Sequence, residues 1–352
     1  MAKHKTTMLT DGGGCGYWRC TLPALRLTHH HDMDISVVEK GDLLHPSCAT
    51  ADTIVIERLA DGHSFAVMRG YQAQGKRIVY DCDDDLFNLA PHNPAHHFMT
   101  DGTKACMRQF LEYADVVTTT TERLKASLLK EAPTANITVI PNSIAVNAVE
   151  CWRPPNRTRS RDGVFRMLWQ GSASHVKDWE MLFPAVDRVF AESRDAILII
   201  MGYLPMCIRK AIKDPDKPQW VKGRIAYVPW KDLKTYRENM YKAIADVGLA
   251  PLEDDYFNAN KSAVKALEYA VAGIPGIYSP VGPYIDVMRD GREGLFASTP
   301  DEWYSQMMRI KRNKKRLREK IVLNSRKMVK NKFDLGKWAP AWIEVLTGEK
   351  VV

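Results

Sequence analysis

Short apolar runs alternate with longer amphipathic stretches along the first half of the chain. β-Branched and apolar runs predict strands at residues 6–10, 34–38, 53–58, 76–81, 115–121 and 136–142. Helical periodicity separates these runs near residues 19–29, 62–74, 102–113 and 121–131. Strands that alternate with crossover helices predict a parallel sheet that is buried on both faces.

The same alternation restarts after a polar interval. The second set of predicted strands comprises residues 165–171, 196–202, 224–230, 246–251 and 274–279, and helices are expected near 178–192, 232–244, 262–272 and 300–330. In the last twenty residues, Trp338 and Trp342 are spaced i, i+4. This spacing predicts a final amphipathic helix that is docked by its aromatic side chains.

These patterns predict an α/β protein with two Rossmann-like domains whose parallel sheets face a central cleft. The N-terminal domain is expected at residues 1–150 and the C-terminal domain at 164–330. The interval 151–163 is rich in proline and arginine and is the predicted linker. Residues 331–352 are expected to hold a helix that packs back toward the N-terminal domain. Because open parallel sheets bind ligands at the carboxyl ends of their strands, the cleft is the expected binding site.

Composition limits the class of protein without naming it. Of the 352 residues, 45% are hydrophobic and 26% are charged, which is typical of a globular protein. No apolar run approaches the ~18 residues that span a bilayer, and the N-terminal stretch lacks the apolar core of a signal peptide. The seven scattered cysteines fit reduced thiols better than a disulfide framework or a zinc site. A cytoplasmic protein is therefore expected, and peripheral contact with the inner membrane face stays open.

Positive charge is concentrated in the second half. Residues 1–150 hold 14 Lys+Arg and 18 Asp+Glu, and the remaining residues hold 36 and 24. The segment 309–332 alone has 12 bases and one acid. A solvated face of an amphipathic helix explains such a run, and contact with an anionic membrane surface or a nucleic acid is the alternative.

The stretch "NANKSAVKALEYAVAGIP", residues 258–275, predicts a helix with unusual charges at its start. Ser262 is the expected N-cap and Gly273 the expected C′ residue. Lys261 and Lys265 place positive charge where the helix dipole favours anions, which suits a bound diphosphate. Glu268 could accept hydrogen bonds from two sugar hydroxyls. A surface Lys–Glu pair worth ~0.3 kcal/mol is the alternative interpretation.

Four aspartates, Asp81, Asp83, Asp84 and Asp85, lie at the end of the predicted strand 76–81, in "VYDCDDDLF". Packed carboxylates repel one another, so their concentration suggests a function. Three interpretations remain open: an acceptor-side or catalytic role for Asp83 and Asp84, capping of the next helix by either residue, and a divalent cation held by Asp83 and Asp85.

The helix at 258–275 resembles the donor-site helix of the retaining GT-B glycosyltransferases of group 1. Their signature is a glutamate, seven residues, a second glutamate and Ala-x-Ala-x-Gly-x-Pro, which "EYAVAGIP" matches. The resemblance implies that Glu268 binds the nucleotide ribose. Asn260 stands where the family has its first glutamate, which contacts the donor sugar. The pattern "Y-D-x-D-D-x-L-F" of one subgroup implies an acceptor-side or catalytic role for Asp83 and Asp84.

Further segments resemble the same family. "LWQGSASHVKDWEML" is similar to its phosphate loop, which implies that Gly171, Ser172 and Lys177 hold the donor phosphates, and His175 lies in the same loop. The family's usual arginine six residues before that lysine is absent, and Lys261 or Lys265 could substitute for it. "YVPW", with Pro229, is similar to the loop beside the base. "DGGGCGYW" is similar to the N-terminal glycine loop, so Gly13 and Gly14 are expected to face the donor diphosphate or the acceptor. The likeness is strong over most of residues 160–310.

The function implied by this resemblance is transfer of a hexosyl or pentosyl group from a nucleotide-sugar to an acceptor hydroxyl, with retention. The donor is a UDP- or GDP-sugar, no cofactor is expected, and lysines with helix termini replace a metal, with Lys177 and Lys265 stabilising the leaving diphosphate. A glycan, a lipid-linked glycan, a protein or DNA could be the acceptor. The alternatives are a transferase acting on a hydroxylated DNA base, a non-catalytic nucleotide-sugar sensor, and a sugar-nucleotide epimerase.

Overall fold

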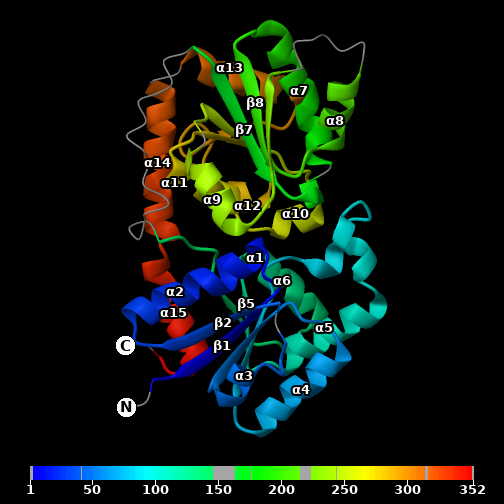
Figure 1. The fold of residues 1–352 in the computed structure, drawn as a ribbon, viewed down its shortest axis with the longest axis vertical. Coiled ribbons are helices and arrows are strands. Elements are labelled where there is room, and N and C mark those ends of the chain that lie inside the picture. Colours follow the sequence, from blue (N-terminus) through cyan, green and yellow to red (C-terminus); the bar gives the residue numbers. More distant parts are fainter. Residues whose placement is uncertain are drawn as a thin grey trace.

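Two six-stranded sheets organise the chain in a computed structural model, which describes residues 3–40, 42–145, 163–175, 177–214, 223–242, 244–313 and 316–350. All strand pairs in these sheets are parallel. The strand orders are β2-β1-β3-β4-β5-β6 and β12-β11-β10-β7-β8-β9. Figure 1 shows the sheets in separate lobes, the N-terminal lobe below and the C-terminal lobe above. The predicted fold of two parallel α/β units is confirmed.

The strands of each sheet follow the apolar runs of the sequence. The first sheet contains β1 (Lys5–Thr10), β2 (Asp34–Glu39), β3 (Thr53–Glu57), β4 (Arg77–Asp81), β5 (Val116–Thr119) and β6 (Ile137–Val139). The second contains β7 (Phe165–Gly171), β8 (Ala196–Gly202), β9 (Ile225–Pro229), β10 (Val247–Ala250), β11 (Gly276–Tyr278) and β12 (Leu295–Phe296). The pattern did not predict β12, because two residues are too few to show a period.

Helices cover the sheets. Those of the N-terminal lobe are α1 (Gly14–Gly16), a π-helical segment (Tyr17–Thr21), α2 (Leu22–His30), α3 (Pro46–Thr50), α4 (Gly62–Ala73), α5 (Asp101–Tyr113) and α6 (Glu122–Glu131). Those of the C-terminal lobe are α7 (Asp178–Glu192), α8 (Met206–Lys213), α9 (Leu233–Lys242), α10 (Tyr256–Asn260), α11 (Val264–Ala272), α12 (Gly282–Ile285), α13 (Pro300–Arg312) and α14 (Arg316–Lys332). Short 3₁₀ segments lie at Leu86–Asn88, Pro94–Phe98 and Ala173–His175. The single helix predicted for 300–330 is two helices, α13 and α14.

The last helix, α15 (Leu335–Thr347), packs on the N-terminal lobe, beside α2 and β4. Arg77 donates to the carbonyl of Val345 at 2.8 Å. Trp342 is buried, and the Arg19 guanidinium lies over it, 5.1 Å from the centre of the tryptophan ring. Figure 1 shows α14 along one side of the molecule, leading from the C-terminal lobe down to α15. The predicted linker lies outside the described residues apart from Gly163. None of the described helices is both long and apolar enough to cross a membrane.

Direct contacts join the lobes at the carboxyl ends of their strands. Thr121, the N-cap of α6, donates to the carbonyl of Asn260 at 3.1 Å. Arg123, the second residue of α6, donates two hydrogen bonds to the carboxylate of Asp286, at 2.5 and 2.8 Å. These contacts set the width of the gap between the sheets, where the site lies.

Candidate functional site

A cavity of about 770 Å³ lies between the lobes and takes side chains from both. That volume suits a nucleotide-sized ligand. Twelve of the fourteen residues expected at the site line it: Gly13, Gly14, Asp83, Asp84, Gly171, Ser172, His175, Pro229, Lys261, Ser262, Lys265 and Glu268. Lys177 and Asn260 do not line it.

The start of α11 supplies the cationic end of the cavity. The helix begins at Val264, and its N-cap is Ala263, which has no side-chain cap. The prediction that Ser262 caps the helix is wrong, because its hydroxyl accepts from the Asn142 amide of the other lobe at 2.8 Å. Gly273 ends the helix with φ 69°, as predicted. Uncapped N–H groups at a helix start attract an anion.

Lys261 is the least engaged cation of the site. Its Nζ is buried and has no hydrogen-bond partner among the described residues. The ammonium lies 4.5 Å from the centre of the Phe257 ring, a favourable but weak contact. A buried ammonium without an acceptor is costly, so an anionic ligand at this position would supply what the protein lacks.

A chain of hydrogen bonds holds Lys265. Asp178, the first residue of α7, accepts from the backbone N–H of Glu253 at 2.7 Å and pairs with Nδ1 of His175 at 2.5 Å. Nε2 of His175 lies 2.9 Å from Nζ of Lys265. Burial and the nearby lysines lower the pKa of His175 to about 3, so the ring is neutral. Nδ1 therefore donates to Asp178, and Nε2 accepts from the ammonium and orients it.

The protonation of the site predicts a narrow pH range for binding. Burial, and secondarily Lys261, lower the pKa of Lys265 to about 8, and burial raises the pKa of Glu268 to about 7. As pH rises through 8 the lysine loses its charge, and as pH falls below 7 the glutamate gains a proton. Affinity for the expected nucleotide-sugar, whose diphosphate keeps its charge, should therefore peak between these values in calorimetric titrations.

The variant Lys265→Arg tests that assignment. A guanidinium stays charged throughout the range in which Lys265 titrates, so the alkaline loss of affinity should disappear while the acidic loss remains. An unchanged alkaline limb in this variant would show that another group titrates.

Glu268 forms the acidic part of the cavity, in the second turn of α11. The residue is 4% exposed, and its carboxylate accepts from the Gln170 amide at 2.6 Å and the Tyr236 hydroxyl at 3.1 Å. Gln170 precedes Gly171 at the end of β7, and Tyr236 lies on α9. Two donors orient the carboxylate toward the cavity while leaving acceptor capacity for ligand hydroxyls.

Aromatic rings line the far end. Tyr227 and Trp230 are 42% and 52% exposed, high values for rings that line a cavity. The Trp230 and Tyr236 ring centres are 5.6 Å apart, and the Tyr227 hydroxyl donates to the carbonyl of Gly202 at 3.0 Å. Exposed rings beside Pro229 provide a surface on which a planar base can stack.

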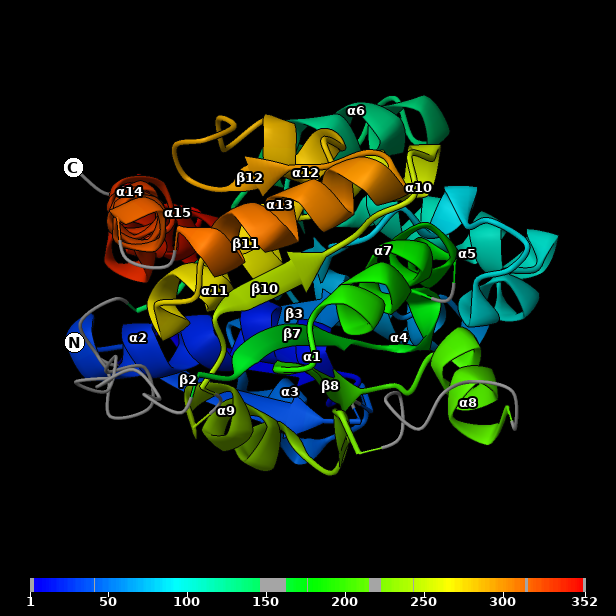
Figure 2. The same cartoon turned by 90° about the horizontal axis from the view of Figure 1, so that it is seen from above.

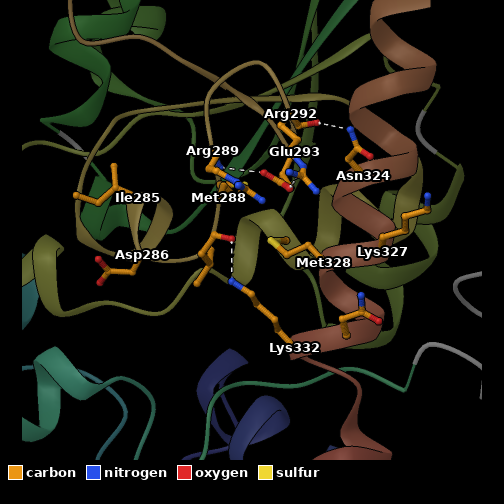
Figure 3. A pocket seen from close by; sticks show the side chains of 12 residues that line it. Ile285, Asp286, Met288, Arg289, Arg292, Glu293, Asn324, Lys327, Met328 and Lys332 are labelled. Atoms are coloured by element: carbon orange, nitrogen blue, oxygen red, sulfur yellow. Dashed lines mark hydrogen bonds and ion pairs between the residues drawn. The ribbon is translucent and has the colours of Figure 1, made fainter.

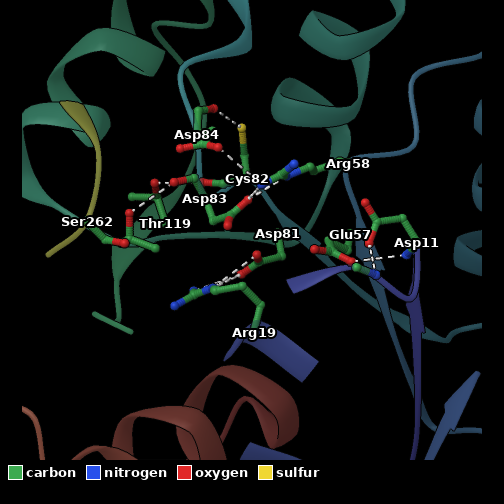
Figure 4. Close-up of polar contacts among 12 residues, drawn as sticks. Asp11, Arg19, Glu57, Arg58, Asp81, Cys82, Asp83, Asp84, Thr119 and Ser262 are labelled. Atoms are coloured by element: carbon green, nitrogen blue, oxygen red, sulfur yellow. Dashed lines mark hydrogen bonds and ion pairs between the residues drawn. The ribbon is translucent and has the colours of Figure 1, made fainter. Parts of the chain in front are cut away.

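The acidic run after β4 divides into carboxylates with different partners (Figure 4). Asp83 pairs with Arg58, and the same guanidinium lies 3.4 Å from Asp84. Both aspartates line the cavity on the N-terminal side, together with Cys15. The predicted cation between Asp83 and Asp85 is not supported, because the ligand-type atoms that gather here belong to Cys15, Asp83 and Asp84, and Arg58 already supplies the positive charge.

Asp81 serves the core of the N-terminal lobe. It is fully buried and accepts from Nε and Nη2 of Arg19 at 3.0 and 2.8 Å. The Thr118 hydroxyl donates to the same carboxylate at 2.5 Å. Arg19 comes from the π-helical segment, so this buried ion pair joins the glycine-loop helix to the sheet. Neither Asp83 nor Asp84 caps the following 3₁₀ segment, whose N-cap position is Asp85 without a side-chain cap bond.

Asn260 joins the lobes. Its amide donates to Asp85 at 2.7 Å, and Asp85 also accepts from Ser127 at 2.7 Å and from Asn88 at 3.0 Å. Asn260 is 4% exposed, and its amide lies on the Asp85 side, outside the cavity lining. A glutamate at position 260 would set a second carboxylate against Asp85.

Asn260→Glu is expected to lower the free energy of unfolding by about 1–3 kcal/mol, because a buried acceptor loses its donor. The melting temperature of the full chain measures the loss. Adding Asp85→Asn to this variant restores one donor and one acceptor, so the double variant should recover part of the stability. A double variant no more stable than Asn260→Glu would contradict the proposed contact.

Lys177 is exposed at the N-cap position of α7. The structure places Tyr227 and Trp230 of the YVPW segment in the cavity lining, and it adds lining residues that the sequence did not single out: Asn142, Gln170, Arg209 and Tyr236. The sequence also did not identify Asp178, which pairs with His175, or Arg58, which pairs with Asp83. The i, i+3 spacing of His175 and Asp178 at the start of a helix was the one available local signal. The sequence held no such signal for Arg209, because only the tertiary placement of α8, which packs on α7, brings this residue to the cavity.

No protein-family model matches this chain, and no curated protein matches its sequence. Solved structures are similar along nearly the whole length. Sucrose-phosphate synthase from Thermosynechococcus elongatus has a TM-score of 0.71 at 14% identity, over 98% of this chain and 99% of that one. HepE of Anabaena, crystallised with UDP, has a TM-score of 0.67 at 14% identity, over 99% and 100%. A glycosyltransferase from Rickettsia africae has a TM-score of 0.66 at 13% identity, over 99% of both chains.

The chain has the GT-B fold. At these identities the similarity establishes the architecture, and the chemistry must be argued from the site. In this GT-B protein the cavity lies where the carboxyl ends of both sheets meet, as the fold predicts.

Proposed function

We propose that the protein transfers a sugar from a nucleotide-sugar to an acceptor hydroxyl. The observation that carries the proposal is the polarity of the cavity along α11. Lys261 and Lys265 lie at the helix start, and Glu268 lies farther along the same helix. The three groups match the charges of a nucleoside diphosphate: cations for the phosphates and a carboxylate for the ribose diol.

The donor would lie mainly on the C-terminal lobe. The free ammonium of Lys261, the oriented ammonium of Lys265 and the N–H groups at the start of α11 would bind the diphosphate. The base would stack near Tyr227 and Trp230. The choice of donor class is supported by HepE, a structurally similar protein that has been crystallised with UDP and with UDP-glucose. UDP- or GDP-sugars are the proposed donors.

The chemical step would depend on stabilisation of the leaving group. Negative charge on the diphosphate grows as the glycosidic bond breaks, and prepositioned cations stabilise it most in the transition state. Asp83 and Asp84 face the opposite side of the cavity, where the acceptor would enter. Asp84 is the less engaged of the two, since its contact to Arg58 measures 3.4 Å. It would orient the acceptor hydroxyl or accept its proton.

We propose retention of the anomeric configuration, by attack of the acceptor on the face that the diphosphate leaves. Asp83 is tied to Arg58 and Asp85 to Asn260, so neither carboxylate is placed as a separate nucleophile. Positive charge from two lysines and a helix terminus can serve the leaving group in place of a divalent cation.

A thermal-shift panel of UDP-, GDP-, ADP- and dTDP-sugars tests the donor. At 100 times its Kd, a ligand stabilises the native state by about 2.7 kcal/mol, which is several degrees for a chain of this size. The sugar-nucleotide that raises the melting temperature most is then incubated with and without an acceptor pool of glycans, lipid-linked glycans and hydroxymethylated DNA. Sugar transfer and nucleoside diphosphate release are measured.

The alternatives give different products. Sugar transfer to DNA and to no other acceptor would identify the protein as a transferase that modifies a DNA base. A sensor would bind the donor without releasing nucleoside diphosphate, and an epimerase would isomerise the donor with no acceptor present. Absence of a thermal shift with every sugar-nucleotide would refute the proposed function.

A further inference from the structure

A second cavity, of about 440 Å³, lies away from the donor cavity, between the loop after α12 and helix α14 (Figure 3). Four bases line it: Arg289, Arg292, Lys327 and Lys332. Two acids, Asp286 and Glu293, also line it, but each already has a cationic partner. Asp286 pairs with Arg123, and Glu293 pairs with Arg292 at 3.0 Å. The cavity therefore keeps an excess of positive charge.

The exposed face of α14 extends this charge. Arg316, Lys320, Leu323, Lys327 and Lys330 are all exposed and recur at alternating spacings of four and three residues, which places them on one side of the helix. Glu319 is the one acid of α14. The surface formed by this face and by Ile285, Arg289 and Arg292 is called the α14 surface below.

Other bases of the 309–332 run are used internally. Lys311 pairs with Asp195 at 2.5 Å, Arg318 with Asp246 at 2.8 Å, and Arg326 donates to the carbonyl of Ala270 at 3.0 Å. The charge run therefore combines structural ion pairs with an outward cationic face. Arg289 and Arg292 lie in a loop about forty residues before Lys327 in the sequence, and they line the same cavity as Lys327.

Two aliphatic side chains stand exposed among these cations. Leu323 is 56% exposed and Ile285 is 45% exposed, on α14 and at the end of α12 respectively. Exposed leucine and isoleucine contribute little to binding a phosphodiester backbone. Among lysines and arginines, they are typical of surfaces that rest on the headgroups of a bilayer.

We propose that the α14 surface binds anionic phospholipid membranes, with a headgroup phosphate in the cavity beside Arg289 and Lys327. The bases attract the charged bilayer, and Leu323 and Ile285 enter its interface. Both views of the fold place α14 opposite α8, so α8 is free of this contact (Figure 2). The proposal concerns a site separate from the donor cavity and does not depend on the sugar that is transferred.

Vesicle co-sedimentation of the full chain tests the proposal. Vesicles of phosphatidylcholine mixed with phosphatidylglycerol should bind the protein, and vesicles of phosphatidylcholine alone should not. Arg289→Glu with Lys327→Glu should lower the partition coefficient at least about tenfold. Leu323→Ser should lower it without any change of charge. The matched control is Lys210→Glu with Lys213→Glu, which reverses the same number of exposed charges on α8 and should bind like the unmodified chain.

Three results would overturn the proposal. Equal losses in the α14 and α8 variants would indicate unspecific charge attraction. Inorganic phosphate that raises the melting temperature through Arg289 and Lys327, without vesicle binding, would assign the cavity to a soluble anion. Binding of duplex DNA that depends on the same residues, again without vesicle binding, would assign the surface to nucleic acid. Because the substituted side chains are exposed, melting curves of the variants should match that of the unmodified chain.

Discussion

Lys265→Ala is expected to lower the turnover number of sugar transfer by about two to three orders of magnitude. The side chain lies at the start of α11, and His175 holds its ammonium at 2.9 Å from Nε2. Removing one prepositioned cation from the leaving diphosphate loses stabilisation that water cannot replace inside the cavity. Steady-state kinetics with the donor selected by thermal shift would measure the effect.

Comparison variants make this result specific. Lys213→Ala removes an exposed lysine of α8 that does not line the cavity, so turnover should stay within about twofold of the unmodified enzyme. Lys177→Ala should also cost less than Lys265→Ala, because Lys177 is exposed and outside the cavity. A larger loss for Lys177→Ala would mean that the loop before α7 closes over the donor and that the resemblance located the phosphate lysine correctly.

Asp81→Ala is expected to lower the free energy of unfolding by about 3–5 kcal/mol. Asp81 and Arg19 have no exposed side-chain surface. Without the carboxylate, the hydrogen bonds left to the buried guanidinium among the described residues are those to the Ile140 carbonyl at 2.5 Å and, at a long 3.4 Å, to Asn142, and the Trp342 ring carries no charge to balance it. An uncompensated charge in the core is the physical cause of the loss. Urea unfolding followed by circular dichroism would measure it.

Asp286→Ala is the matched control. Asp286 also binds an arginine through two bonds, but its side chain and that of Arg123 are 41% and 46% exposed. Exposed ion pairs contribute about 0–1 kcal/mol, so this variant should unfold at nearly the original urea concentration. Similar losses in the two variants would contradict the structural role assigned to Asp81.

The acidic run after β4 shows where sequence reasoning stops. Its four aspartates look alike in the sequence, yet Asp81 neutralises a buried arginine, Asp85 holds Asn260 across the lobes, and Asp83 and Asp84 face the cavity beside Arg58. Alternation along a strand separates neighbouring side chains but does not reveal their partners. Those partners lie between 25 and 175 residues away along the chain.

Helix α11 shows the opposite case. The sequence showed the charges near the start of this helix and Gly273 at its end. In the structure the helix forms, Gly273 ends it in the left-handed conformation, and Lys261, Lys265 and Glu268 line the cavity. The capping assignment of Ser262 was wrong, because Asn142 of the other lobe takes its hydroxyl. A local rule therefore failed where a contact between lobes competed with it.

By itself the sequence determined the two parallel sheets, most of their strands and the helix that carries the cationic end of the site. These features depend on periodicity and on neighbours within one or two turns, which a linear pattern records. Only the tertiary structure decided which polar groups are structural and which face the ligand. It also decided that bases from two separate segments form one surface on α14. These assignments depend on which polar groups are buried together. Packing between residues far apart in the chain determines that burial.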